Sequence, residues 1–231
     1  MLRWTESKQC QDLASEIVKS GHSVSMPTQQ RKGPQPYHHG HLRDALIRAA
    51  SGILEKDGLP ELSLRRVAQA AGVSSAAPYH HFADKKALLD AIATEGFSAL
   101  RNEMLTRMQR ETDPRTRTQA CGIAYVAFAL HNPALFRLMF GGDEHPLSAD
   151  AALSQPRKLT YDVLEQAVAA ESSNGTANPL TCLGLWALVH GIAKLILEGG
   201  IRPSEYGVKS GLALAVRVLG HRLNEGGPRS F

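Results

Sequence analysis

Residues 63 to 82, S-L-R-R-V-A-Q-A-A-G-V-S-S-A-A-P-Y-H-H-F, decide the fold of this chain. Apolar residues at three- and four-residue spacing predict a short helix with one buried face. That face consists of Leu64, Val67, Ala68 and Ala71. Gly72 can adopt a left-handed conformation and end this helix, and Ser74 is placed to cap a second one. Two short helices joined by a Gly-Val-Ser turn are typical of a helix-turn-helix, whose second helix enters the major groove of DNA.

The second helix should expose polar and small side chains to DNA. We expect Val73 and Phe82 to point inward and Ser75, Ala76, Tyr79 and His80 to point outward. Pro78 falls in the first turn of this helix, where a missing backbone N–H costs little. No Arg or Lys of this helix reaches a base edge.

Flanking residues predict the other helices of the same unit. From His41 to Lys56 apolar residues repeat on one face, which predicts an amphipathic helix. Asp57-Gly58 should end it, and Ser63 should cap the helix that follows. Asp84 should begin a long helix that reaches about Arg110. Its first turn carries Lys85 and Lys86, the wrong sign for a helix N-terminus unless a phosphate lies there.

Composition is compatible with an intracellular DNA-binding protein. The chain has 231 residues, of which 43% are apolar and 21% charged, enough to form a core. A net charge of +4 and a pI of about 9.1 fit a polyanionic partner without identifying one. Three scattered cysteines favour a reducing compartment, and no apolar run reaches eighteen residues. We therefore expect a cytoplasmic protein with no membrane contact.

Residues 1 to 36 look unlike a folded domain. Their second half is polar and contains three prolines, so we predict a disordered N-terminal extension. Met26 is an alternative start, which leaves open whether residues 1 to 25 belong to the native protein. Arg31 and Lys32 could form a basic arm along the DNA backbone, or simply a solvated tail.

Residues from about Leu42 to Leu100 resemble the DNA-binding domain of the tetracycline-repressor (TetR) family. The turn A-x-x-A-G-V-S stands at 68 to 74, Y-x-x-F at 79 to 82, and D-K-x-x-L-L at 84 to 89. The family usually has Gly where Ala76 stands and a large apolar residue where Pro78 stands. The resemblance implies that Arg65 contacts a guanine and that Tyr79 and Lys85 contact phosphates. The full DNA-binding set that we predict is Ser63, Arg65, Ser74, Ser75, Ala76, Tyr79, His80, Lys85 and Lys86.

The rest of the chain predicts a second helical layer and an all-α protein. We expect helices at 115–131, 133–140, around 159–168 and at 180–197. The last of these is apolar nearly all the way round, so it needs cover on more than one side, and we infer a homodimer. The expected organisation is an extension at 1–36, a helix-turn-helix domain at 37–102 (the helix-turn-helix itself at about 63–84), and an effector-binding and dimerisation domain at 103–225.

Two C-terminal stretches resemble a TetR subgroup with a Trp-His-Gly signature. They are H-N-P-A-L-F-R-L-M-F at 131 to 140, and Trp186, His190 and Gly191. The resemblance implies a four-helix dimer bundle from the last two helices of each chain and a cavity for a small effector. From the residues alone, we expect Gly191 to allow close helix approach and His190 to bond a backbone carbonyl in the core.

Apolar inward residues of this layer suggest a hydrophobic or aromatic effector. The predicted ligand-binding residues are Phe128, Phe136, Met139, Leu164, Trp186 and His190, with Ile123 beside them. The alternative is that these residues pack a solid core. We expect the helix from Lys85 to tilt and change the spacing of the two recognition helices.

The sequence favours a homodimeric repressor that such an effector releases from a palindromic operator. An activator is the alternative. A metal-responsive regulator would use His38, His39 and His41, or His80 and His81, but neither cluster has Cys or Asp at ligand spacing. A helical adaptor for another protein is a further alternative. No nucleophile turn, phosphate loop or paired carboxylates indicate an enzyme, and we expect neither a metal nor a cofactor.

Overall fold

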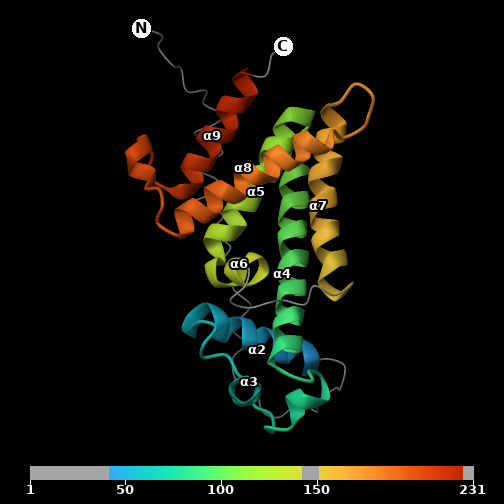
Figure 1. Ribbon diagram of the computed structural model, residues 1–231, viewed down its shortest axis with the longest axis vertical. Helices are drawn as coiled ribbons and strands as arrows, with labels where there is room; N and C mark the ends of the chain where they lie inside the picture. The colour runs from blue at the N-terminus through green and yellow to red at the C-terminus, as the bar shows by residue number, and fades with distance from the viewer. Residues whose placement is uncertain (1–41, 142–150, 226–231) are drawn as a thin grey trace.

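A computed structural model describes residues 42–141 and 151–225, and within these ranges the regular structure is helical. The predicted extension at 1–36, and with it His38, His39 and His41, lies outside the described residues. The helices run in chain order as in Figure 1. They are α2 (Leu42–Asp57), α3 (Leu64–Ala70), the 3₁₀ helix η1 (Ala77–His80), α4 (Lys85–Met108), α5 (Pro114–His131), α6 (Pro133–Phe140), α7 (Ala151–Glu171), α8 (Pro179–Leu197), the 3₁₀ helix η2 (Pro203–Tyr206) and α9 (Gly211–Glu225).

α2, α3, η1 and the start of α4 pack around one small core. Leu46, Val67 and Leu88 are completely buried in it, and Phe82 is buried as predicted. Ser63 caps α3, because its side chain accepts a hydrogen bond from the Arg66 N–H at 3.2 Å. Gly72, with φ of 70°, ends α3 in the predicted left-handed turn. The helix-turn-helix framework is thus confirmed.

The recognition element differs from the prediction. Its regular part is four residues of 3₁₀ helix, Ala77–His80, and Ser74 does not cap it through its side chain. Pro78 explains the difference, because it has no N–H to donate to the Ser74 carbonyl, which instead accepts from the Ala77 N–H at 3.0 Å. The Pro78 ring is buried, while Val73, expected inward, is only partly so. Proline thus packs where the family usually has a large apolar side chain.

One continuous helix joins the two halves of the molecule. α4 has 24 residues, and Asp84 caps its N-terminus because the Asp84 carboxylate accepts a hydrogen bond from the Ala87 N–H at 2.8 Å. Leu88 and Ile92 lie in the small N-terminal core, and Phe97, Leu100 and Met104 lie in the C-terminal one. The boundary expected at 102/103 falls inside this helix, so the two halves share it.

The C-terminal layer is built around α5. This helix packs against α4, α7, α8 and α9, and its residues from Ile123 to Ala129 are all buried. Figure 1 shows α4 and α7 side by side, with α8 crossing them and α9 at the end opposite the helix-turn-helix. The core here is large and aromatic, and Phe128 and Phe136 are completely enclosed.

α8 is only partly covered within the chain. Leu180, Leu183 and Leu195 have 78%, 51% and 47% of their surface exposed. Gly191, expected at a close helix contact, has nothing within 4 Å of a Cβ built on it. By length and composition α8 could cross a membrane, with a mean hydropathy of 1.8. A helix that packs against a partner subunit can have the same length and apolar composition.

Candidate DNA-binding surface and ligand cavity

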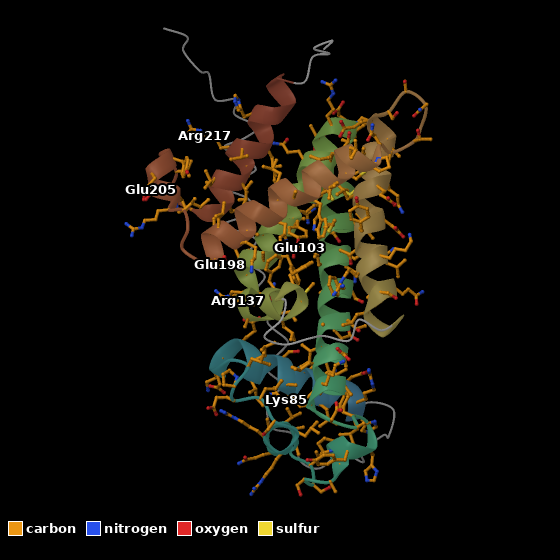
Figure 2. All side chains as sticks on the ribbon, viewed as in Figure 1. Lys85, Glu103, Arg137, Glu198, Glu205 and Arg217 are labelled. Atoms are coloured by element: carbon orange, nitrogen blue, oxygen red, sulfur yellow. The ribbon has the colours of Figure 1, made fainter. Side chains whose placement is uncertain are left out.

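All nine residues predicted to contact DNA are exposed. They come from the start of α3, the turn before η1, η1 itself and the first turn of α4, and α3 packs directly on η1. Tyr79 is 59% exposed, although it is an aromatic side chain. Figure 2 places Lys85 at this end of the molecule, far from the labelled side chains of α8 and α9. The helix-turn-helix therefore presents one polar and basic end.

The two neighbouring arginines of α3 have different environments. Arg66 forms ion pairs with Asp57 at 2.8 Å and with Glu61, which hold it against the end of α2. Arg65 is exposed. Lys85 donates from Nζ to the Leu59 carbonyl at 3.1 Å, leaving two of its three N–H groups for another acceptor. Arg65 and Lys85 thus remain able to meet DNA.

A cavity of about 420 Å³ lies in the C-terminal layer. Its walls come from α4, α5, α6, α7, α8 and α9, and they are mainly apolar and aromatic. The wall residues are Phe97, Met104, Thr118, Cys121, Gly122, Tyr125, Phe140, Ser154, Arg157, Lys158, Thr160, Tyr161, Leu164, Leu185, Trp186, Val189 and Leu219. A mostly apolar hollow of this size is typical of a small-molecule site.

The structure divides the predicted ligand-binding residues. Leu164 and Trp186 line the cavity, whereas Phe128, Phe136 and Met139 are buried in the core beside it. Ile123 is likewise core. The three sit on the faces of α5 and α6 that pack against neighbouring helices, and an apolar residue looks the same in sequence whether it meets a helix or a hollow.

His190 lies behind the cavity wall, in contact with it through Tyr125. Its Nδ1 is 2.8 Å from the Tyr125 hydroxyl, so its partner is a side chain and not the expected backbone carbonyl. Trp186 lies against the His190 ring, with ring centroids 5.9 Å apart. The tautomer of the imidazole sets which group donates in the Tyr125–His190 hydrogen bond.

The pKa values of these groups agree with that arrangement. Burial raises the pKa of Tyr125, against the opposing effect of the Trp186 hydrogen bond, so the phenol stays protonated. Burial and the nearby Lys194 ammonium lower the pKa of His190, while Glu198 opposes them. Both groups are therefore neutral near pH 7, and this wall of the cavity carries no charge.

Comparison with known proteins identifies the family. Residues 46–92 match the family model described as bacterial regulatory proteins, tetR family, and residues 118–219 match that of a tetracyclin repressor-like C-terminal domain. The chain belongs to the TetR family. Transcription regulators of this family bind DNA, and the residues at 68–74, 79–82 and 84–89 of this chain carry the resemblance.

Individual relatives cover the two halves of this TetR-family regulator unequally. Tetracycline repressor protein class C of Escherichia coli is 47% identical over 51 residues, 22% of this chain and 23% of its own length. The regulator BetI of Klebsiella pneumoniae (strain 342) is 29% identical over 125 residues, 46% of this chain. The chain spans less than two thirds of the length of these curated relatives, 62% for BetI.

A solved structure covers nearly the whole fold. A protein of unknown function from Rhodococcus sp. RHA1 is 35% identical, with a TM-score of 0.70, over 84% of this chain and 98% of its own. The likeness therefore includes the C-terminal layer, which the curated relatives match only in part.

Sequence reasoning missed the aromatic residues that shape the cavity of this TetR-family protein. Phe97, Tyr125 and Phe140 line it, and their rings contact one another or His190. The sequence did not indicate that Tyr125 and His190 are in contact, because 65 residues separate them along the chain. Among residues 42–141 and 151–225, no group of three or more His, Cys, Asp or Glu side chains could hold a metal ion.

The lowered pKa of His190 predicts a measurable pH effect. Between its ordinary value of 6.5 and the lower folded value, the unfolded chain binds a proton that the folded chain does not, so this residue destabilises the fold as the pH falls through that window. We expect His190→Gln to reduce the loss of thermal stability between pH 7 and pH 5. A wild-type and variant Tm that fall in parallel over this range would contradict the assignment.

Proposed function

We propose that this protein is a homodimeric repressor that leaves a palindromic operator when a small, largely apolar effector fills its cavity. One observation carries the proposal: α4 begins at the exposed basic end of the helix-turn-helix and continues, unbroken, into the wall of the 420 Å³ cavity. A change in the cavity therefore acts on the same rigid element that orients the DNA-binding end. The protein would act in the cytoplasm, where its operator is.

On the operator, Arg65 would read a base and Tyr79, Lys85 and Lys86 would hold the phosphate backbone. Arg65 extends from the exposed side of α3, and a guanidinium fits the two acceptors of a guanine edge. The recognition element offers hydroxyls, Ala76 and His80 instead of further cations. Specificity would thus depend on few direct contacts, and most of the affinity would come from the phosphates.

Arg65 and Lys85 should behave differently on replacement. Arg65→Ala should cost about 1–3 kcal/mol on the operator and relax preference at one base pair in each half-site, because only a base contact carries sequence information. Lys85→Ala should weaken binding to all sequences alike and lower the salt dependence by about one ion per subunit. Fluorescence anisotropy with operator and random duplexes at several salt concentrations measures both.

Arg110→Ala is the matched control, since Arg110 follows the opposite end of α4 and carries the same charge. It should leave affinity, specificity and salt dependence unchanged. Equal losses on operator and random DNA for Arg65→Ala would reject Arg65 as a base reader.

The exposed face of α8 supports dimerisation through the last two helices. Leu180, Leu183 and Leu195 are exposed along it, and Gly184 and Gly191 leave open space beside the helix. Small residues between exposed leucines allow a second helix to approach closely. Covering this face with the same face of a second copy would produce the two-fold symmetry that a palindromic operator requires.

Leu183→Glu should separate the dimer without unfolding the subunit. Each apolar side chain buried at an interface contributes about 1.5–3 kcal/mol, and two-fold symmetry doubles the change, so the dimer dissociation constant should rise about a hundredfold or more. Analytical ultracentrifugation measures it. Leu159→Glu, an exposed leucine of α7, is the control and should remain dimeric. A dimer that tolerates Leu183→Glu as well as Leu159→Glu would place the interface elsewhere.

α6 offers a second connection between the cavity and the DNA-binding end. Its last residue, Phe140, lines the cavity, and its Leu138 is buried in the helix-turn-helix core. The Leu135 N–H, in the first turn of α6, donates to Glu55 of α2 at 2.8 Å, and Arg137 donates to the Leu197 carbonyl at the end of α8 at 3.1 Å. Figure 2 shows Arg137 and Glu198 close together where α6 meets α8.

These contacts make α6 a bridge between α2, the cavity and the helix that we propose forms the dimer. An effector can shift the equilibrium only by its differential affinity: turning a mostly bound repressor mostly free needs about 10⁴-fold tighter binding to the released conformation. An effector that pushed the rings of Phe140 and Phe97 apart would displace both α6 and α4.

A double-mutant cycle tests the bridge without an identified effector. Leu164→Trp enlarges a side chain of the wall and should lower operator affinity by imitating an occupied cavity. In a Glu55→Ala background, which removes the acceptor of the Leu135 N–H, this loss should shrink by about 0.5–2 kcal/mol. Glu55→Gln keeps an acceptor oxygen and should retain the coupling. Strictly additive effects of Leu164→Trp and Glu55→Ala on operator affinity would show that α6 does not transmit the change.

A further inference from the structure

We propose that the effector is an anion: a small carboxylic acid whose apolar body fills the cavity and whose carboxylate pairs with Arg157. This inference rests on the proposed effector role of the cavity and adds the chemical class of its ligand. The argument begins with charge. Among the described residues that line the cavity, Arg157 and Lys158 are the charged ones, both are cations, and no Asp or Glu of this part of the chain lies in the wall.

The two cations are not equivalent. Lys158 donates from Nζ to Asp162 Oδ1 at 2.7 Å, one helical turn away, so its charge is largely neutralised. Arg157 forms no ion pair with any carboxylate in the described part of the chain. Its guanidinium instead lies 5.5 Å from the centre of the Phe97 ring, which is itself part of the wall. Arg157 thus places an uncompensated charge at the edge of the cavity.

The position of Arg157 determines how a ligand would lie. The side chain is exposed, so it marks the mouth of the cavity, while Phe97, buried in the core, marks the inner side. A planar guanidinium presents N–H groups that match the two oxygens of a carboxylate, and it keeps its charge at any physiological pH. The acid group would therefore remain at the solvent side and the rest of the molecule would point inward.

Further inside, the polar groups are already paired. Thr160 donates its hydroxyl toward the Phe97 and Pro156 carbonyls at 3.1 and 3.0 Å, and the Tyr125 hydroxyl bonds His190. The interior therefore offers apolar contact with Leu164, Trp186 and their neighbours and few vacant hydrogen-bonding groups. A volume of 420 Å³ is near the small end of ligand pockets, which span about 300–1,000 Å³. An aryl-alkanoic or medium-chain acid fits these conditions, whereas a nucleotide-sized molecule does not.

Matched probes test the charge. The protein is titrated by calorimetry with 3-phenylpropanoate, 3-phenylpropanamide and 3-phenylpropylamine, and with octanoate and octanamide. Trp186 fluorescence, measured in a Trp4→Phe background, reports occupancy. The acids should bind about tenfold or more tightly than their amides, and the amine should bind most weakly. Arg157→Gln should remove the preference for the acid but keep the weaker binding of the amide. Lys158→Gln, at the adjacent and already paired cation, should retain most of the preference.

Each other outcome is decisive. Equal binding of acid and amide, tighter binding of the amine, or a preference that survives Arg157→Gln overturns the proposed anion site. In those cases the effector role of the cavity stands if Leu164→Trp abolishes binding. If no probe binds at millimolar concentration, the carboxylate proposal is wrong. If in addition Leu164→Trp leaves operator affinity unchanged, the effector role fails with it.

Discussion

The continuity of α4 is the constraint on which the rest of the structure depends. A helix is stiff because each turn is bonded to the next, and α4 is buried at both ends in different cores: Leu88 in the helix-turn-helix and Phe97 in the C-terminal layer. Neither core can rotate independently while both sides of α4 remain packed. α4 therefore fixes the orientation of the two cores relative to each other. α6, which is hydrogen-bonded to Glu55 and to the end of α8, is a second connection between them.

Local signals in the sequence predicted most of the fold. Side-chain caps at Ser63 and Asp84, a glycine at the end of α3, and apolar spacing are all properties of consecutive residues, and the boundaries of α2, α4, α5, α6 and α8 followed to within one or two residues. α7, expected around 159–168, extends from Ala151 to Glu171 because its first part lacks the apolar spacing of the second. η1 differs because of a local effect that was underestimated. Pro78 removes a donor where the helix has not yet formed its i to i+4 bonds, so the chain remains in the tighter 3₁₀ form.

The cavity could not be predicted in this way, because it is a property of packing between distant segments. Phe128 and Tyr125 lie on one helix, three residues apart, and both are buried, but only Tyr125 faces the hollow. Sequence periodicity distinguishes inside from outside, and it does not distinguish a filled interior from an empty one. By contrast, the nine residues predicted to contact DNA are all exposed, since a short helix in a small domain has only one free face.

An unfilled apolar space is itself a physical argument for a ligand. Residual cavity volume in a protein core costs about 24 cal/mol for each Å³, and a larger side chain at Leu164 would be a simple way to reduce it. The walls here also carry the Tyr125–His190 hydrogen bond on one side and, on the other, the Arg157 guanidinium, which forms no ion pair within the described residues. Packing alone requires neither feature. A mainly apolar interior with this guanidinium at its mouth would select for the shape of an apolar molecule inside and for a negative charge at the entrance.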